Sequence, residues 1–125
     1  MVQYPKFKLS VVNSSYYFVE LSNNIEFDVY DMKQLVKAEQ QLSGLKLPVL
    51  VICPATANTN IHLMRHLKEN KNNPYSVADA FVIAATSQAI LGNFYLKISQ
   101  PERPTKFFNR EADALEWLKD FLSNN

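Results

Sequence analysis

Hydrophobic residues recur in short, regular patterns along this chain, and the patterns predict alternating strands and helices. Residues 7–12 and 16–21 are rich in aromatic and β-branched side chains and flank the turn-forming cluster 13–15. We therefore expect an antiparallel β-hairpin. Its second arm places Tyr17 on one face and Tyr16 and Phe18 on the other, so both faces of the hairpin are largely apolar.

The next pattern predicts a helix and then a buried strand. From Val29 to Leu42, apolar residues recur every three or four positions; Asp28 suits the N-cap, and Gly44 suits the left-handed position after the helix end. Residues 45–53 are apolar without alternation, which is typical of a parallel strand covered by helices on both faces. We expect a central parallel strand that ends at Cys53.

The remaining chain continues this alternation. A polar loop is predicted over residues 54–60, a short helix over 61–69, a buried strand over 78–85 and a short strand over 105–108. Ser87 and Asn109 suit the N-caps of two further helices. The buried side of the first of these helices would comprise Ile90, Leu91, Phe94 and Ile98. The inward stripe of the second would comprise Ala114, Leu115, Leu118, Phe121 and Leu122, beside Trp117.

The element order β-β-α-β-α-β-α-β-α predicts the fold class. We expect one α/β domain over residues 1–125, with a mixed sheet whose parallel central strands are flanked by helices. In particular, strands 47–53 and 78–85 should be parallel neighbours.

Composition and charge narrow the classes of partner. The chain has 125 residues, of which 47% are apolar and 20% charged, and its net charge is +1. This composition is typical of a globular protein, and so small a net charge does not attract the chain to nucleic acid or to an anionic membrane. We therefore expect neither nucleic-acid binding nor membrane insertion. Cys53 is the single cysteine, and the N-terminal stretch lacks the apolar core of a signal peptide. Both features favour the cytoplasm.

Few residues suggest chemistry. His62 and His66 lie four apart on a predicted helix with Glu69 nearby, a spacing that could hold zinc with a third ligand, although a solvated helix face explains it more simply. Cys53, with His62 as base, could act as a nucleophile at the end of the central strand, although a buried packing role is commoner. We therefore expect no metal, no cofactor and no enzymatic activity.

Several charged residues are interpreted as structural. Asp79 could be a buried carboxylate, but we expect it at an exposed strand entrance. Glu111 and Asp113 suit the start of the last helix through its dipole. A small basic patch is expected around the last predicted strand, formed by Arg103, Lys106 and Arg110. It could contact an acidic partner or a phosphate, although a solvated surface explains it at least as well.

The C-terminal segment 104–122, together with the element order, resembles the STAS-like domains. This group includes anti-sigma-factor antagonists and the cytoplasmic domains of sulfate transporters, and the likeness is greater to small stand-alone bacterial STAS-like proteins. The residues that match are Phe108, Glu111, Asp113, Ala114, Trp117 and Leu118. The resemblance implies a non-enzymatic module that binds another protein and is sometimes switched by phosphorylation at the start of the helix after the central strand. The corresponding segment here has Thr56 and Thr59 but lacks the Asp-Ser-Ser-Gly sequence.

Three hypotheses of function follow. The first is a regulatory protein-interaction module that contacts a protein partner through the interaction loop, defined by Thr56, Asn58, Thr59 and Asn60. A homodimer could form through the apolar hairpin residues Tyr16, Tyr17 and Phe18. The second is a binder or sensor of a small apolar ligand or lipid, held near Phe81, Ile90, Phe94 and Tyr95. The third is a small enzyme that uses Cys53.

Overall fold

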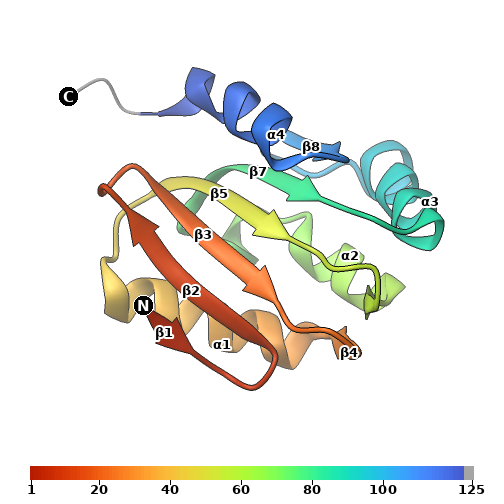
Figure 1. The fold of residues 1–125 in the computed structure, drawn as a ribbon, viewed down its shortest axis with the longest axis horizontal. Helices are drawn as coiled ribbons and strands as arrows, with labels where there is room; N and C mark the ends of the chain where they lie inside the picture. The colour runs from red at the N-terminus through yellow and green to blue at the C-terminus, as the bar shows by residue number, and fades with distance from the viewer. Residues whose placement is uncertain (123–125) are drawn as a thin grey trace.

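The computed structural model describes residues 1–122, and its centre is a six-stranded sheet in the order β1-β2-β3-β5-β7-β8 (Figure 1). The strands are β1 (Val2–Gln3), β2 (Phe7–Val12), β3 (Tyr16–Leu21), β5 (Leu47–Ile52), β7 (Ser76–Val82) and β8 (Thr105–Phe108). The first three strands pair antiparallel, whereas β3, β5, β7 and β8 pair parallel. The predicted α/β class is thereby confirmed, including the parallel pairing of β5 with β7.

Helices cover both faces of this sheet. They are α1 (Val29–Leu42), α2 (Ile61–Leu67), α3 (Thr86–Phe94), which continues into the π-helical turn η2 (Tyr95–Ser99), and α4 (Glu111–Leu118). Short 3-10 turns, η1 (Asn70–Asn72) and η3 (Lys119–Phe121), follow α2 and α4. From β3 to β5, β7 and β8, each parallel strand is added on the same side of the previous one in the sheet. Right-handed crossover connections therefore put the connecting helices α1, α2 and α3 on the same face. Helix α4 returns over the opposite face, as Figure 1 shows.

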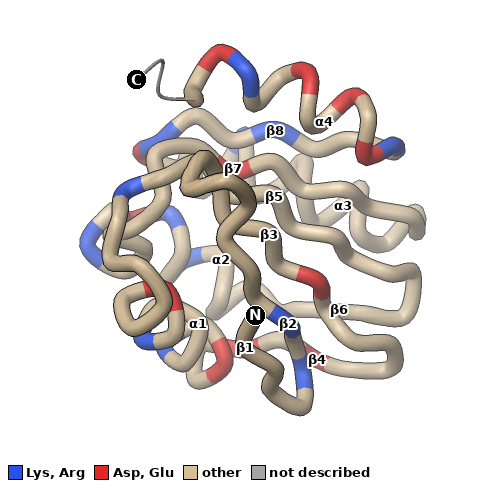
Figure 2. The backbone as a smooth tube through the Cα atoms, turned by 60° about the vertical axis from the view of Figure 1, so that its left-hand side comes forward, with Lys and Arg blue, Asp and Glu red and all other residues tan. Residues whose placement is uncertain are grey.

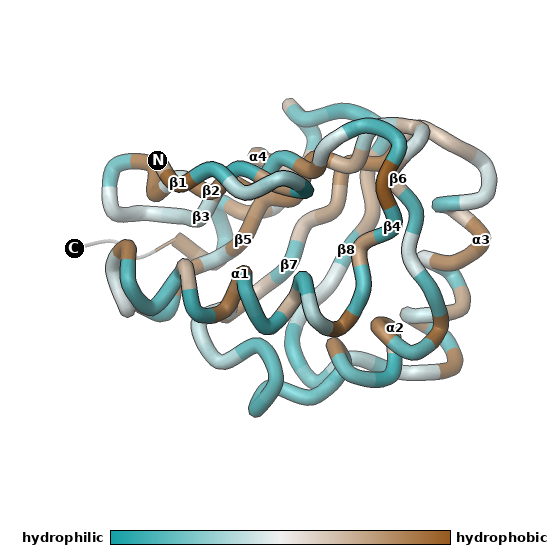
Figure 3. The backbone as a smooth tube through the Cα atoms, turned by 90° about the horizontal axis from the view of Figure 1, so that it is seen from below, coloured by the Kyte–Doolittle hydropathy of each residue, from teal (hydrophilic) through white to brown (hydrophobic). Residues whose placement is uncertain are grey.

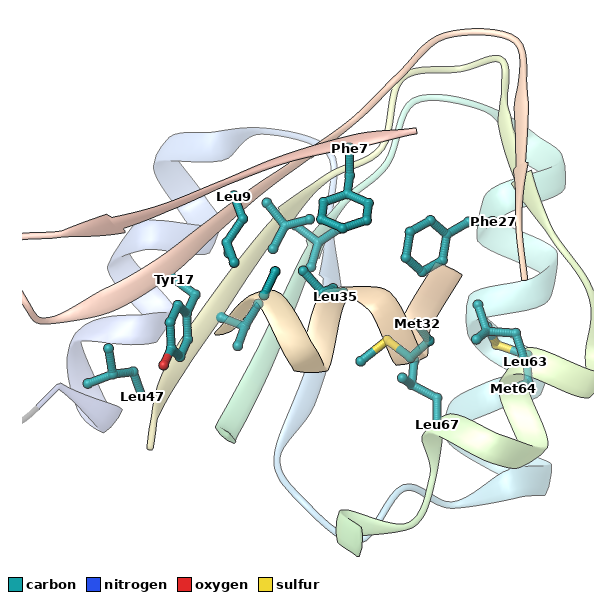
Figure 4. Close-up of a cluster of buried hydrophobic side chains, with 14 of the residues drawn as sticks. Phe7, Leu9, Tyr17, Phe27, Met32, Leu35, Leu47, Leu63, Met64 and Leu67 are labelled. Atoms are coloured by element: carbon teal, nitrogen blue, oxygen red, sulfur yellow. The ribbon is translucent and has the colours of Figure 1, made fainter. Parts of the chain in front are cut away.

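The core is correspondingly divided into two clusters. The larger one lies between the sheet and α1 to α3, and it joins hairpin residues such as Phe7 and Leu9 to Leu35 of α1 and Met64 of α2 (Figure 4). The smaller one lies under α4, where Leu50, Ala78 and Ala80 meet Ala114 and Leu118. Strand β5 contributes to both clusters, which explains its apolar sequence without alternation. Figure 3 shows the apolar stretch of β5 next to α1, along which hydrophobic and hydrophilic residues alternate.

The caps of α1 are confirmed, whereas two other predicted caps are wrong. The Asp28 side chain accepts a hydrogen bond from the backbone N–H of Asp31 at 3.1 Å, and Gly44 has a φ of +69°. Helix α3 begins at Thr86 after Ala85, one residue before the predicted cap Ser87. Helix α4 begins after Arg110, so Asn109 lies outside it. Apolar or long side chains occupy both true N-cap positions, so the sequence has no local signal there.

Three short strands escaped the sequence pattern. Besides β1, the strands β4 (Ile25–Phe27) and β6 (Ala57–Thr59) form a separate two-stranded parallel sheet. Strand β6 falls within the predicted loop 54–60, and β7 begins at Ser76 and ends at Val82 rather than spanning 78–85. Strands of two or three residues are too short to show the two-residue alternation by which a strand is predicted from sequence.

Charge is unevenly spread over the helices. Figure 2 shows acidic and basic residues interspersed along α1, whereas the charged residues of α4 are all acidic and α3 has no charged residue. Within residues 1–122, no helix combines the length and the hydrophobicity needed to cross a membrane.

Candidate functional site

A cavity lies between the sheet and the three helices α1, α2 and α3. It has a volume of about 100 Å³, and its wall is mostly apolar. The sheet contributes Val19, Val51 and Phe81 to this wall, and the helices contribute Leu35, Met64 and Leu91. An apolar cavity of about 150 Å³ stays dry and binds benzene, so this smaller one suits a molecule no larger than roughly one ring or a short alkyl chain.

At the end of the cavity near the carboxyl ends of the strands, Gln88 connects α3 to the preceding loops. Its Nε2 donates to the carbonyls of Pro54 at 2.7 Å and Ala57 at 2.9 Å. Its Oε1 accepts from the backbone N–H groups of Ala84 and Ala85 at 2.8 and 2.9 Å. The amide is thus fully satisfied within the chain, and its role is to hold the loop and α3 together.

A buried ion pair lies at the opposite end of the cavity. The guanidinium of Arg103 donates from Nε to Asp79 Oδ2 at 2.6 Å and from Nη2 to the carbonyl of Leu67 at 2.8 Å. The hydroxyl of Ser76 donates to the other oxygen of Asp79. The amide oxygen of Asn73, oriented toward the guanidinium, accepts from Nη2 at 2.9 Å.

This ion pair corrects two predictions. Asp79 was expected at an exposed strand entrance and Arg103 in a solvated basic patch, yet both side chains are buried. The reason is tertiary: β7 and β8 are neighbours, so two residues 24 positions apart meet and neutralise each other beneath the sheet. Lys106 and Arg110 are exposed, and Arg110 pairs with Asp113 at the start of α4.

The cavity wall also contains a carboxyl group that has no partner. The side chain of Glu39, on α1, is buried at 1% exposure, and neither of its oxygens has a hydrogen-bond partner within the described part of the chain. Burial, and secondarily the charge of Asp79, raises the pKa of Glu39 to about 8, although Arg103 opposes this shift. Glu39 is therefore mostly protonated at neutral pH.

Sequence reasoning missed Glu39, although a signal existed. Met32, Leu35 and Leu42 were assigned to the buried stripe of α1, and position 39 continues that stripe, seven residues after Met32. No role is predicted for Glu39 from the sequence, since residues of this type are rarely buried without a partner. Its place on the apolar face was the available indication.

The interaction loop predicted from the sequence is largely engaged by its own neighbours. Thr56 Oγ1 accepts from the backbone N–H of Asn24 at 2.9 Å, and Thr59 Oγ1 donates to the carbonyl of Phe27 at 2.6 Å. Asn60 caps α2 by accepting from the N–H of Leu63 at 3.0 Å. Asn58 is exposed on β6. Partner binding or phosphorylation at this loop stays a prediction.

The predicted dimer surface on the hairpin is wrong for Tyr17. This residue is 0% exposed, and its hydroxyl donates to the carbonyl of Leu45 at 2.7 Å and lies 2.7 Å from Ser43 Oγ. Tyr16 and Phe18, on the other face of β3, are half-buried against the cluster beneath α4. Tyr17 lies on the face that α1 covers and is not accessible to a second chain, whereas a dimer contact through Tyr16 or Phe18 stays a prediction.

The residues predicted for an apolar ligand are only partly brought together. Phe81 and Tyr95 line the cavity, but Ile90 is 65% exposed, and Phe94 is not part of the wall. Ile98, predicted on the buried side, is also exposed, at 67%. The inward face of α3 instead comprises Gln88 and Gly92 and leads to Tyr95 in η2.

Gly92 explains this different orientation of α3. A Cβ atom at this position would lie 3.0 Å from the ring of Phe107, closer than ordinary van der Waals contact. The missing side chain therefore lets α3 approach β8, and the helix faces the sheet with its small and polar side. The branched residues Ile90 and Ile98 are left outside.

The groups considered for catalysis and metal binding have different surroundings. Cys53 lines the cavity, and burial raises its pKa to about 12, so the thiol stays protonated near neutral pH. His62 is exposed on α2. Burial lowers the pKa of His66, with a smaller contribution from Lys33. Among residues 1–122, no three histidine, cysteine or acidic side chains gather in a way that could hold a metal ion.

Comparisons with known proteins identify the fold and the family of this chain. No curated protein matches the sequence. One solved structure is similar: the crystal structure of an uncharacterised protein of the DUF3478 family, with a SpoIIAA-like fold, from Shewanella loihica PV-4. The match has a TM-score of 0.56 and 13% identity, and covers 94% of this chain and 98% of that one. At this identity the likeness shows the fold alone, and it confirms the STAS-like resemblance. The model of a domain of unknown function, DUF7793, matches residues 15–122, and the chain therefore belongs to the DUF7793 family.

Proposed function

We propose that this protein is a non-enzymatic module that binds a small apolar molecule in the cavity beneath its sheet. The observation that supports the proposal is the cavity itself, with apolar side chains of the sheet and of three helices around about 100 Å³. The ligand would lie between the sheet and the helices, in contact with Phe81 and Tyr95.

The energetics of packing favour a use for this space. Protein interiors are normally close-packed, and an empty cavity destabilises a fold by about 24 cal/mol per Å³. For about 100 Å³ this amounts to roughly 2 kcal/mol. Since Val19 and Val51 are small members of the wall, one larger side chain could fill much of the space. A retained cavity is easier to understand if a ligand occupies it.

The polar groups around the cavity favour binding over a reaction. Gln88 is satisfied by the backbone, and Asp79 is paired with Arg103. Cys53 is held in its protonated form by its raised pKa, which opposes a role as nucleophile.

A cavity-filling variant tests the proposal. Val51→Phe introduces a ring into the cavity from β5, whereas Ile52→Phe adds the same ring on the opposite face of the strand, where Ile52 is half-buried. We expect toluene to raise the thermal midpoint of the wild type and of Ile52→Phe but not of Val51→Phe. NMR titration with toluene should show the same order. A wild type that binds no toluene, or a Val51→Phe variant that binds it equally well, would contradict the proposal.

A second candidate function is contact with another protein through the outer face of α3 and η2. Ile90 and Ile98 are about two-thirds exposed, and the half-buried Phe94 lies between them in the sequence. Figure 2 shows no charge along α3. Large exposed aliphatic residues that gather on one element are typical of an interaction site.

Sedimentation can test whether this second surface mediates self-association. The Ile90→Glu variant would be compared with Val77→Glu, which adds the same charge at an exposed position of β7. We expect the wild type and Val77→Glu to show a mass that rises with concentration and Ile90→Glu to remain a single chain. A wild type that stays a single chain at every concentration would reject self-association through this surface.

A further inference from the structure

The carboxyl group of Glu39 lacks any partner in a place where polar groups are normally paired. Its side chain is 1% exposed and contributes to the cavity wall, and both of its oxygens are unbonded among residues 1–122. Most buried polar side chains in native proteins have at least one partner, and leaving one unsatisfied costs about 1–3 kcal/mol. The missing partner could be supplied by a molecule in the cavity.

The position of Glu39 on α1 argues against a purely structural role. Met32 and Leu35 precede it on the same buried face, and all three residues line the cavity. A leucine at position 39 would continue this apolar stripe without an unsatisfied group. A polar group that is unfavourable for stability and faces a cavity is typical of a functional position.

The charges near Glu39 indicate what kind of group it would meet. Asp79 and Arg103 are the charged neighbours that act on it, and they are already paired with each other, so together they offer no free charge to a ligand. Because burial raises the pKa of Glu39, the cavity wall presents an uncharged carboxyl, which can donate one hydrogen bond and accept another. A charged ligand would have to lose its hydration in this apolar space without a free counter-charge.

We infer that Glu39 binds the hydroxyl group of a small alcohol or phenol whose apolar body fills the cavity. The inference rests on the proposed function and adds the chemical class of the ligand. A hydroxyl both donates and accepts, so it complements the protonated carboxyl at both oxygens. The volume of about 100 Å³ limits the body to roughly one ring or a short alkyl chain.

The test uses four probes of similar size: toluene, phenol, benzoate and benzylamine. Their affinities for the wild-type chain would be measured by NMR titration at pH 7. We expect phenol to bind roughly five- to tenfold more tightly than toluene, the amount that one or two net hydrogen bonds supply. Benzoate and benzylamine should bind more weakly than phenol.

Two variants separate the role of the carboxyl from that of the cavity. Glu39→Leu should bind toluene at least as well as the wild type and lose the preference for phenol. Glu39→Gln keeps a donor and an acceptor and should retain most of that preference. Unfolding curves check that each variant is folded, and the retained toluene binding of Glu39→Leu provides a second check.

The outcomes distinguish this inference from the proposed function. If the wild type binds neither toluene nor phenol, both fail. If it binds toluene as tightly as phenol, the cavity binds ligands but the role of Glu39 is refuted, and ordered water would then satisfy the carboxyl. Tighter binding of benzoate or benzylamine than of phenol would also overturn the inference.

Discussion

Replacing Glu39 with glutamine should change how the stability of the protein depends on pH. In the folded chain the pKa of Glu39 is about 8, whereas its ordinary value is 4.5. Between these two values the folded state keeps a proton that the unfolded state has released, so the free energy of unfolding falls as pH rises. The stabilisation that the bound proton gives to the folded state is fully present below pH 4.5. It is lost progressively as the pH rises and is gone above about pH 8.

The expected size follows from the same two values. Each pKa unit corresponds to about 1.4 kcal/mol, so the interval from 4.5 to about 8 amounts to roughly 5 kcal/mol as an upper limit. Glutamine has a similar shape and does not titrate, so the variant lacks this loss. Glu39→Gln should therefore be more stable than the wild type at pH 8 by a few kcal/mol, with a smaller difference at pH 5.

The assay is urea unfolding followed by the fluorescence of Trp117, the single tryptophan. Trp117 packs against Phe108 and Phe121 on the α4 face of the sheet, away from Glu39, so it reports unfolding without contacting the mutated site. His66 titrates with the opposite sign, because its lowered pKa makes the folded state more stable as pH rises, but this effect is common to both proteins and cancels in their difference.

Glu20→Gln provides the matched control, because Glu20 is exposed on β3. Its pH dependence should follow that of the wild type. The reasoning is refuted if the stability difference between Glu39→Gln and the wild type is the same at pH 5 and pH 8.

Three further predictions concern the residues around the cavity. Arg103→Met leaves the buried carboxylate of Asp79 without its counter-charge and should lower the free energy of unfolding by about 3–5 kcal/mol. In urea unfolding, the double variant Arg103→Met with Asp79→Leu should recover much of this loss. Strictly additive effects of the two substitutions would contradict a stabilising interaction between these residues. Gly92→Ala places a methyl group 3.0 Å from the ring of Phe107 and should lower the thermal midpoint. The reason is that overpacking costs about 1–3 kcal/mol, whereas the higher helix propensity of alanine contributes only about 1 kcal/mol. A raised midpoint would show that the ring can move. Cys53, with a pKa of about 12, should react with a disulfide reagent at pH 7.5 much more slowly than free cysteine. Unfolding the chain in urea should restore the reactivity of the thiol. Rapid labelling of the folded chain would instead support the hypothesis of an enzyme that uses Cys53.

The sequence by itself determined the order of the longer elements and the class of the fold, whereas the short strands β1, β4 and β6 escaped it. The parallel pairing of β5 with β7 followed from two apolar segments joined through a helix, and the start and end of α1 followed from Asp28 and Gly44. These features depend on periods of two or 3.6 residues and on caps, and each of these is decided by residues close together in the chain.

Only the tertiary structure decided the site. The pairing of Asp79 with Arg103 needs β7 and β8 side by side, and the orientation of α3 needs the contact between Gly92 and Phe107. The cavity depends on how far three helices approach one sheet, and the isolation of Glu39 depends on what surrounds it there. Such contacts join residues distant in sequence, and their energy depends on distances of a few ångströms that local patterns do not encode.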